Sequence, residues 1–320
     1  MLSKFTKGKK GLVGLDIGSS RIKAVEVKSK GQGRYELVNI GQVPLLADTI
    51  VDGQIIDGNH VSDCINRIFE EQEIKADQIA TSISGHAVIV KKINVPAMSS
   101  EELREQIHWE AEQHIPFDIN DVNLDYHILD GEIGGNVDVL LVACKKDMVS
   151  QLTQVISQAG KTPSVVDVDA FALQNAYEVN YRPPLKQAAM LLNIGASVLN
   201  INIVRGSNSV FTRDVSLADA EPLLQSVTEM LAAEVQRTLD FFYSQTASEE
   251  SHLERMLVAG GSSKVNGLIA YLAARFQMPV EPFDPFRNIS ISPKKFDESY
   301  IQEFAPDMAV AVGLALRGAS

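Results

Sequence analysis

The sequence predicts an α/β protein in which two halves follow one structural plan and a smaller unit is inserted in the first half. The main observation is an internal repeat of a strand, a tight turn and a second strand, at residues 12–27 and again at 189–204. Two unrelated hairpins could share such a turn by chance. Because each copy opens a half of similar size, duplication of one plan is the better explanation. The alignment needs no gap and pairs Asp16 with Asn193, Gly18 with Gly195, and Ser20 with Ser197.

The composition is that of a folded protein and restricts the ligands that it can bind. The 320 residues are 45% hydrophobic and 22% charged, which excludes a disordered or collagen-like chain. Aspartate and glutamate number 41 against 29 lysines and arginines, so the formal charge is -12. The chain as a whole therefore repels nucleic acids and acidic lipid surfaces, and no nucleic-acid partner is expected. Any polyanion must be held by local donors.

Cysteine content and hydropathy predict a cytoplasmic protein. Cys64 and Cys144 are too few for a disulfide framework, and neither has metal-ligand spacing to a histidine. Residues 1–12 are basic but contain no apolar run long enough for a signal sequence. The uncharged stretch 187–204 approaches membrane-spanning length, but its asparagines and its alternation indicate a strand and a turn.

Helices and strands alternate along the chain, and their spacing predicts the domain boundaries. A capping box of Ser99 and Glu102 opens a helix that ends before Pro116. Other expected helices are 60–72, 148–159, 169–179, 265–277 and the apolar 306–316, and other expected strands lie within 79–95 and at 137–144 and 257–259. The expected domains are 10–84 and 164–186 with the terminal helix 306–318 as the first core, 85–163 as the inserted subdomain, and 187–305 as the second half.

Two features of the second half indicate a ligand. A long helix is expected to begin near residues 221–222, and it carries Glu234 and Arg237 three residues apart, where both can reach one ligand. A surface ion pair explains the same spacing equally well. Further on, a short strand runs into Gly260 and Gly261, and glycines between a strand and a helix let backbone N–H groups approach an anion or a nucleotide.

The order of these motifs resembles that of the actin-like ATPases. Within that superfamily the sequence is most similar to the family of cytoplasmic type IV pilus assembly proteins that includes PilM, relatives of the division protein FtsA. The motifs that carry the resemblance are Gly14–Ser20 with Lys23, Asn193–Ala196, Arg213–Asp214, Leu231–Phe241, Ala259–Ser263 and Ala309–Arg317. The resemblance covers almost the whole chain. It implies a duplicated actin-like (ribonuclease H-like) domain with a nucleotide cleft between its halves.

The resemblance also implies ATP and Mg²⁺ as cofactors. Gly18 lets the hairpin backbone approach the phosphates, and Ser19 and Ser20 offer donors to the phosphate oxygens. A phosphate would repel Asp16, so the expected role of this carboxylate is to hold Mg²⁺ through water. Lys23 either neutralises phosphate charge or is a solvated strand residue. The contacts implied for the second half are Gly195, Ala196 and Ser197 to the phosphates, Glu234 and Arg237 beside the ribose and base, and Gly260, Gly261 and Ser262 over the adenosine.

One position departs from the family pattern. The second phosphate turn of these proteins usually carries an aspartate where this chain has Asn193, and that carboxylate helps to organise the metal and the attacking water. An amide can hydrogen-bond water but cannot accept its proton. Asp16 and Asn193 are thus the expected catalytic positions, and the chain is expected to be at most a slow ATPase.

Three functions are compatible with these features. The preferred one is an ATP-binding scaffold of type IV pilus assembly, and hence of twitching motility. It would bind the N-terminal cytoplasmic tail of a membrane-anchored PilN-like protein at the inner face of the cytoplasmic membrane, with other pilus assembly proteins as further partners. A small-molecule or sugar kinase of the same superfold and a filament-forming actin-like protein are the alternatives. The tail is expected to bind where residues 85–163 meet the core, beside the strand-like segment 85–95.

Overall fold

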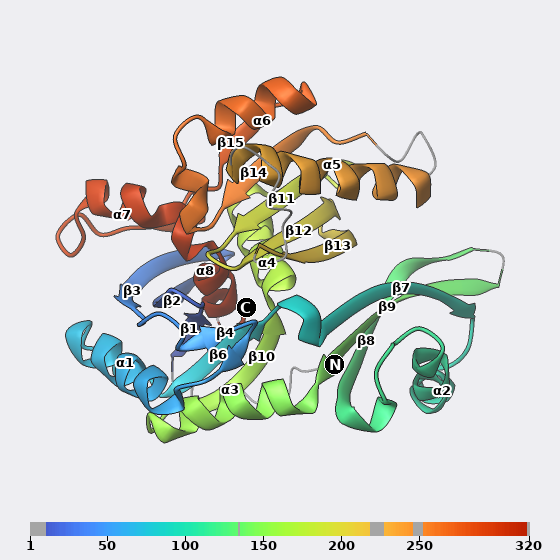
Figure 1. Cartoon of the computed structure of the whole chain (residues 1–320), viewed down its shortest axis with the longest axis horizontal. Coiled ribbons are helices and arrows are strands. Elements are labelled where there is room, and N and C mark those ends of the chain that lie inside the picture. Colours follow the sequence, from blue (N-terminus) through green and yellow to red (C-terminus); the bar gives the residue numbers. More distant parts are fainter. Residues whose placement is uncertain (1–10, 134, 218–226, 246–251, 319–320) are drawn as a thin grey trace.

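A six-stranded sheet forms the core of the first half (Figure 1). The computed structural model describes residues 11–133, 135–217, 227–245 and 252–318. Across the sheet, the strands are β10 (Thr162–Val168), β6 (Gln78–Ile83), β1 (Leu12–Ile17), β2 (Arg21–Gly31), β3 (Arg34–Pro44) and β16 (Ile289–Ser290). The first three strands in sequence form an antiparallel meander, and β6 and β10 add to it in parallel on the β1 side.

The second half repeats this arrangement. Its five strands are, across the sheet, β13 (Asn208–Ser216), β12 (Val198–Arg205), β11 (Ala188–Ile194), β14 (Arg255–Ala259) and β15 (Val280–Pro282). Here too the first three strands form an antiparallel meander, and the next two add in parallel beside its first strand. The predicted duplication of one plan is confirmed.

Two helices pack between the sheets and join the halves into one core. They are α4 (Asp169–Tyr181) and α8 (Ala309–Leu316), and every residue of α8 is buried, as its uniformly apolar sequence predicts (Figure 1). A single hydrophobic cluster contains Val25 of the first sheet, Leu191 of the second, and residues of both helices. A Cβ on Gly313 would lie 1.7 Å from the backbone oxygen of Ala172, so only glycine permits this close approach of α8 to α4.

The inserted unit has a sheet and a core of its own, and it extends to one side of the molecule (Figure 1). Its sheet order is β7 (Val88–Pro96), β9 (Asn136–Lys145) and β8 (Val122–Ile133), covered by α2 (Ser100–Glu112). The predicted capping box is present, since the Ser99 hydroxyl accepts from the Glu102 N–H and the Glu102 carboxylate accepts from the Ser99 N–H. Sequence reasoning missed β8, and α2 ends four residues before Pro116 because 113–116 turn away from the helix.

The last helix of the expected insertion belongs with the first core. This helix, α3 (Lys146–Gln158), packs beside α1 (Gly58–Glu71), and its Val155 and Ile156 lie in the hydrophobic cluster under the first sheet. We therefore propose 88–145 as the unit that packs separately, rather than the full 85–163. A short hairpin of β4 (Ile50–Val51) and β5 (Gln54–Ile55) lies next to α3.

Of the remaining helices, two pack on the second sheet and one, through Ile301, packs in the hydrophobic cluster shared by both halves. They are α5 (Val227–Gln245), α6 (Leu268–Phe276) and α7 (Glu298–Phe304). The predicted start of the long helix near 221–222 lies outside the described residues. The helix expected from residue 265 begins at Leu268 instead, because a 3-10 turn at Gly261–Lys264 and the left-handed Gly267 (φ +82°) precede it.

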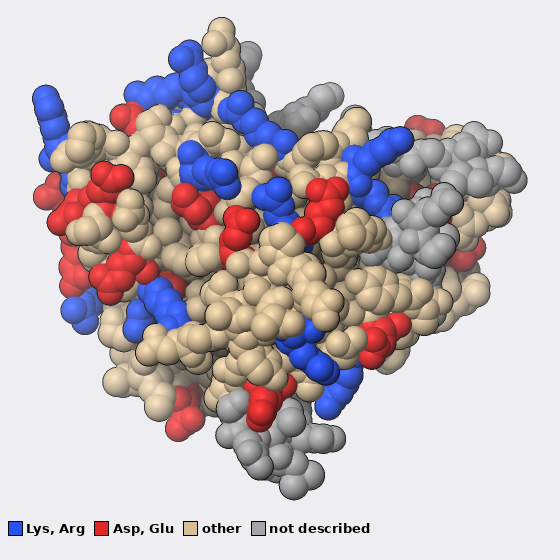
Figure 2. All heavy atoms as spheres, turned by 90° about the horizontal axis from the view of Figure 1, so that it is seen from above, with Lys and Arg blue, Asp and Glu red and all other residues tan. Residues whose placement is uncertain are grey.

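The distribution of surface charge and the hydropathy of the helices describe the outside of the molecule. Seen from above, lysine and arginine side chains alternate with aspartate and glutamate over the face in Figure 2. The negative charge of the chain is therefore not gathered into one patch on this face. Among the described residues, no helix is both long and apolar enough to cross a membrane.

Candidate functional site

Both repeated turns open onto one cavity between the halves. The cavity has a volume of about 350 Å³, and residues of both sheets and of the loops that follow their strands line it. Of the fourteen expected site residues, it contains all but two: Asp16, Gly18, Ser19, Ser20, Lys23, Asn193, Gly195, Ala196, Ser197, Gly260, Gly261 and Ser262.

The two turns have the same backbone geometry. The Gly18 N–H donates to the Arg21 oxygen at 3.1 Å, and the Gly195 N–H donates to the Val198 oxygen at 2.9 Å. A Cβ on residue 195 would lie 2.9 Å from the Val198 oxygen, so the second turn needs a glycine at this position. The repeat seen in the sequence therefore reflects two equivalent tight turns.

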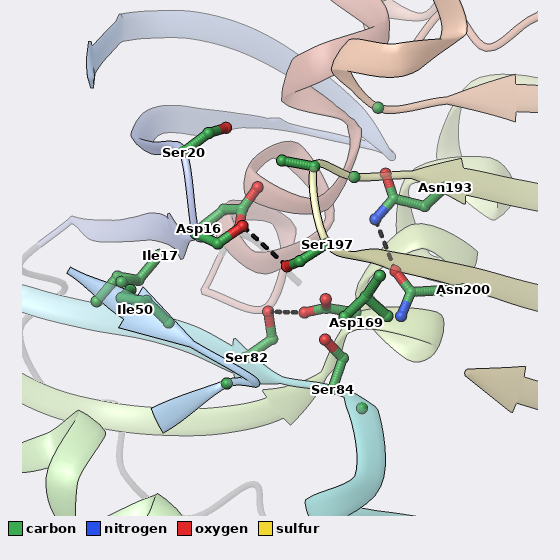
Figure 3. Close-up of a pocket in the computed structure, with 18 of the residues that line it drawn as sticks. Asp16, Ile17, Ser20, Ile50, Ser82, Ser84, Asp169, Asn193, Ser197 and Asn200 are labelled. Carbon is green, nitrogen blue, oxygen red and sulfur yellow. Dashed lines mark hydrogen bonds between the residues drawn. The ribbon is translucent and has the colours of Figure 1, made fainter. Parts of the chain in front are cut away.

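The turns meet face to face across the cavity. The hydroxyl oxygens of Ser19 and Ser197 lie 2.9 Å apart, one from each half. Figure 3 shows Ser197 and Ser20 on opposite sides of the space between the turns. Hydroxyl groups and exposed turn amides on both sides of one narrow space are suited to an oxyanion such as a phosphate.

Equivalent strand positions carry a charged pair in the first half and an amide pair in the second. Lys23 Nζ donates to Asp16 Oδ2 at 2.8 Å, and at the matching positions Asn193 Nδ2 donates to Asn200 Oδ1, also at 2.8 Å. Burial lowers the pKa of Lys23, but the charge and the hydrogen bond of Asp16, together with the charges of Asp307 and Asp169, outweigh burial and the pKa is raised. The lysine therefore stays cationic in the cavity wall.

Asp169 is a second carboxyl group in the cavity. It is the first residue of α4, directly after β10, and it accepts a hydrogen bond of 2.5 Å from the Ser82 hydroxyl at the end of β6 (Figure 3). Burial and the nearby charge of Asp16 raise the pKa of Asp169 to about 7, against hydrogen bonds from Ser82 and Ser84 that lower it. This group is therefore partly protonated at neutral pH.

Asp214 of β13 is a further carboxyl group of the cavity wall. Its Oδ1 accepts from Asn200 Nδ2 at 2.8 Å, and its Oδ2 accepts from the Gly85 N–H at 2.6 Å. Burial raises the pKa of Asp214, although both hydrogen bonds favour the ionised form. Sequence reasoning assigned no role to Asp169 or Asp214. An aspartate that follows a parallel strand and opens a helix was the available signal for Asp169, because the carboxyl ends of such strands border clefts.

The glycine loop predicted over the adenosine closes one side of the cavity. Gly260 has a φ of +87°, and a Cβ there would lie 2.4 Å from the Ile194 oxygen, so this position requires glycine. The Ser262 hydroxyl donates to the Gly195 oxygen at 3.0 Å, which links the loop to the second turn. Lys264 and Asp307, which sequence reasoning missed, form an ion pair of 3.0 Å at this end of the cavity.

The two exceptions are Glu234 and Arg237, which are absent from the described lining of the cavity. Both belong to α5, where Arg237 forms an ion pair with Glu234, and Arg213 Nη2 lies 3.5 Å from the same carboxylate. Glu234 is buried, and Arg237 is about half exposed. The described structure therefore shows the ion pair that was the alternative explanation of their spacing. A position of Glu234 and Arg237 beside the ribose and base remains a prediction.

The carboxyl groups of the cavity suit a metal that arrives with a ligand. Among the described residues, no group of three or more His, Cys, Asp or Glu side chains is placed to hold a metal ion alone. Mg²⁺ commonly takes one or two carboxylates and completes its shell with waters and substrate phosphates. Asp16 and Asp169 interact electrostatically within the cavity wall, so they fit this requirement.

Comparison with known proteins identifies the family. The family model described as type IV pilus assembly protein PilM matches residues 14–220 and 218–319. The chain belongs to this family. A solved structure described as the PilM-PilN type IV pilus biogenesis complex is 28% identical, with a TM-score of 0.85 over 98% of this chain and 100% of that chain. The family predicted from the sequence resemblance, that of the type IV pilus assembly protein PilM, is therefore confirmed.

More distant structures have the same fold. The ethanolamine utilization protein EutJ of Carboxydothermus hydrogenoformans is 12% identical, with a TM-score of 0.53 over 95% of this chain and 88% of that chain. A Bacteroides thetaiotaomicron protein described as having an actin-like ATPase fold is 10% identical, with a TM-score of 0.52 over 98% of this chain and 99% of that chain. The expected actin-like fold of this PilM-family chain is confirmed.

The raised pKa of Asp169 predicts a pH-dependent stability. The folded chain holds this proton up to about pH 7 whereas an unfolded aspartate releases it near 3.8, so stability falls as the pH rises between these values. Between pH 5 and pH 8, the loss is about 2–3 kcal/mol in the free energy of unfolding. Asp169→Asn should abolish most of it, as measured by urea unfolding at both pH values.

Asp297, whose pKa is shifted in the opposite direction, provides the control for the direction of the stability change. Hydrogen bonds from Ser299 lower the pKa of Asp297, so Asp297→Asn should reduce stability at neutral pH rather than relieve the loss. An Asp169→Asn variant with the same pH dependence as the wild type would contradict the assignment.

Proposed function

We propose that this chain is an Mg·ATP-binding scaffold of type IV pilus assembly that takes up the N-terminal cytoplasmic tail of a PilN-like membrane protein. The observation that carries the nucleotide part is the pair of equivalent turns that face each other across one cavity, with Ser19 and Ser197 in contact. The partner is proposed from the similar solved complex, whose description names PilN. Contact with the inner face of the cytoplasmic membrane would then come through this partner.

Each wall of the cavity has a distinct role in this proposal. Turn amides and hydroxyls at Gly18–Ser20 and Gly195–Ser197 bind phosphate oxygens, and Lys23 adds a positive charge. Asp16 holds Mg²⁺ through water, and the metal offsets the repulsion between carboxylates and phosphates. Gly260–Ser262 lies over the adenosine.

The proposed hydrolysis is slow or absent. Asn193 donates to Asn200 and has no carboxylate with which to share the charge of a metal or accept a proton from water. Asp169 is a carboxyl group of the cavity that can orient water, and its pKa of about 7 suits a general base at neutral pH. The chain thus lacks the second-turn carboxylate that would share the charge of the metal and organise the attacking water, and this loss is the reason to expect slow hydrolysis.

The tail site is proposed at the apolar end of the same cavity. Ile50, Ile55, Met148 and Leu152 line this end, and Met148 also packs in the cluster at the base of the inserted unit. β7 is one of the two edge strands of the inserted sheet, and it is the one that follows the link from the first core, so its outer backbone groups can pair with an extended peptide. A groove with apolar anchors and a strand edge suits a short, disordered tail of moderate affinity, roughly micromolar.

ATP binding should be saturable and should depend on Mg²⁺. Titration with a fluorescent ATP analogue should show binding that weakens at least about tenfold on Asp16→Ala, because the variant loses its proposed hold on the metal. Asp63→Ala, an exposed carboxylate on α1, should leave the affinity unchanged. Absence of saturation at millimolar nucleotide would contradict the proposal.

Turnover should lie well below the median enzyme rate of about 10 per second. Asn193→Asp should raise it, since a carboxylate returns to the second turn, whereas Asp169→Asn should lower what remains. Phosphate release measured under saturating Mg·ATP checks both changes. A wild-type rate near the median, or phosphoryl transfer to an added sugar, would exclude a slow or inactive ATPase.

Tail binding should depend on the apolar end of the cavity. Ile50→Asp places a charge among apolar anchors, so the affinity for a fluorescent peptide of the PilN N-terminal tail should fall at least about tenfold while ATP binding persists. Leu46→Asp, on an exposed residue of the same segment, is the matched control.

A deletion tests the contribution of the inserted unit. Val88 pairs with Cys144, so a short linker in place of 89–143 joins chain ends that already lie side by side. Unchanged peptide affinity in this variant, in folded form, would contradict a contribution of β7 to the tail site.

A further inference from the structure

We propose that a hydrogen-bond network through Asp214 couples the second phosphate turn to the inserted unit, so that nucleotide and peptide change each other's affinity. This inference rests on the proposed function and names the regulation of its two sites. The Asp214 network consists of Asn193, Asn200, Asp214 and Gly85. It runs without interruption from the end of β11 to the residue that opens the link into β7.

Each step of the network is a short and directed hydrogen bond. Asn193 Nδ2 donates to Asn200 Oδ1 at 2.8 Å, Asn200 Nδ2 donates to Asp214 Oδ1 at 2.8 Å, and the Gly85 N–H donates to Asp214 Oδ2 at 2.6 Å. Asn200 is buried, with 2% of its surface exposed. Both ends of its amide are used, so a shift of Asn193 disturbs the bond that Asn200 makes to Asp214.

The far end of the network is the base of the inserted unit. Gly85 has a φ of +80° and opens the short turn Gly85–Ala87 between β6 and β7. β13 contacts both this turn and β7, so the second half touches the base of the insertion across the cavity. Ser84, the preceding residue, is bound by Asp169 of the first half. The link is thus held by one carboxyl group from each half.

The near end of the network is where a phosphate must enter. Asn193 is two residues before Gly195, and the contact between Ser19 and Ser197 closes the space between the turns. A phosphate that takes this space must separate the two hydroxyls and thereby move the second turn. The new position of the turn is then passed to Asn193.

Burial makes the network respond as a unit. Asp214 is a half-buried carboxyl group at the cavity wall, and its two oxygens accept from the Asn200 amide and the Gly85 N–H. Loss of one donor would leave a largely desolvated carboxylate oxygen without its hydrogen bond, which is costly, so partly broken arrangements are disfavoured. An element with two discrete arrangements is what coupling between separate sites requires.

The test is a double measurement of affinity. The Kd of the fluorescent PilN-tail peptide is measured with and without saturating Mg·ATP, and the Kd of the ATP analogue with and without saturating peptide. The wild type should show the same change, at least about fivefold, in both experiments, because coupling is reciprocal. Asp214→Asn replaces one accepting oxygen with an NH₂ group that faces another donor, and Asn200→Ala removes the side chain that links Asn193 to Asp214. Either variant should reduce the change in Kd to below about twofold.

A matched variant separates coupling from general damage. Asp138→Asn makes the same substitution at a carboxylate that accepts from Asn94 and pairs with Lys92 within the inserted sheet, and it should leave the coupling intact. Coupling that persists in Asp214→Asn and Asn200→Ala would overturn the proposal. Two ligands that bind the wild type independently would overturn it as well.

Amide exchange decides the question if the wild type fails to bind ATP or peptide. That failure would contradict the proposed function, while the network itself predicts that Asn200→Ala accelerates hydrogen exchange at the Gly85 amide in the ligand-free protein. Asp138→Asn should not affect this amide. Unchanged exchange in Asn200→Ala would overturn the Asp214 network.

Discussion

The face-to-face contact of two equivalent turns is the constraint around which this molecule is organised. Each turn is closed by a hydrogen bond from a glycine N–H, that of Gly18 or Gly195. The hydroxyl oxygens of Ser19 and Ser197 then lie 2.9 Å apart. The meanders that carry the turns must therefore face each other. The buried helices α4 and α8 hold them in this relation, with Gly313 allowing their close approach.

Charge in the cavity follows from this arrangement. Asp16, Asp169 and Asp214 come from three strand or helix ends that converge on it, and Lys23 is paired with Asp16. Buried carboxyl groups that are close together resist full ionisation, as the raised pKa values of Asp169 and Asp214 indicate. A cavity of this kind gains most from a ligand that brings its own cation, which is the reason for proposing Mg·ATP rather than a bare anion.

Local patterns predicted much of the fold and the centre of the site. The repeat, the capping box at Ser99 and the buried terminal helix each depend on neighbouring residues, and each is present. The alignment of Asp16 with Asn193 also marked the two turns as equivalent, and both turns line one cavity. These features could be read from sequence because the spacing itself determines the geometry.

Features that depend on tertiary topology could not be read in this way. The convergence of Asp169 with Asp16 requires β10 and β1 to lie in one sheet with β6 between them. The packing of α3 on α1 likewise depends on where the inserted sheet ends. In contrast, β8 was predictable, because Leu124, Tyr126 and Ile128 alternate with polar residues.

The most direct test of the account is a crystal structure of the chain with Mg²⁺ and a non-hydrolysable ATP analogue. The account predicts the triphosphate between Gly18–Ser20 and Gly195–Ser197, with the contact between Ser19 and Ser197 broken and Mg²⁺ joined to Asp16 through water. A nucleotide bound elsewhere, or a cavity with the two serines still in contact at saturating ligand, would contradict it.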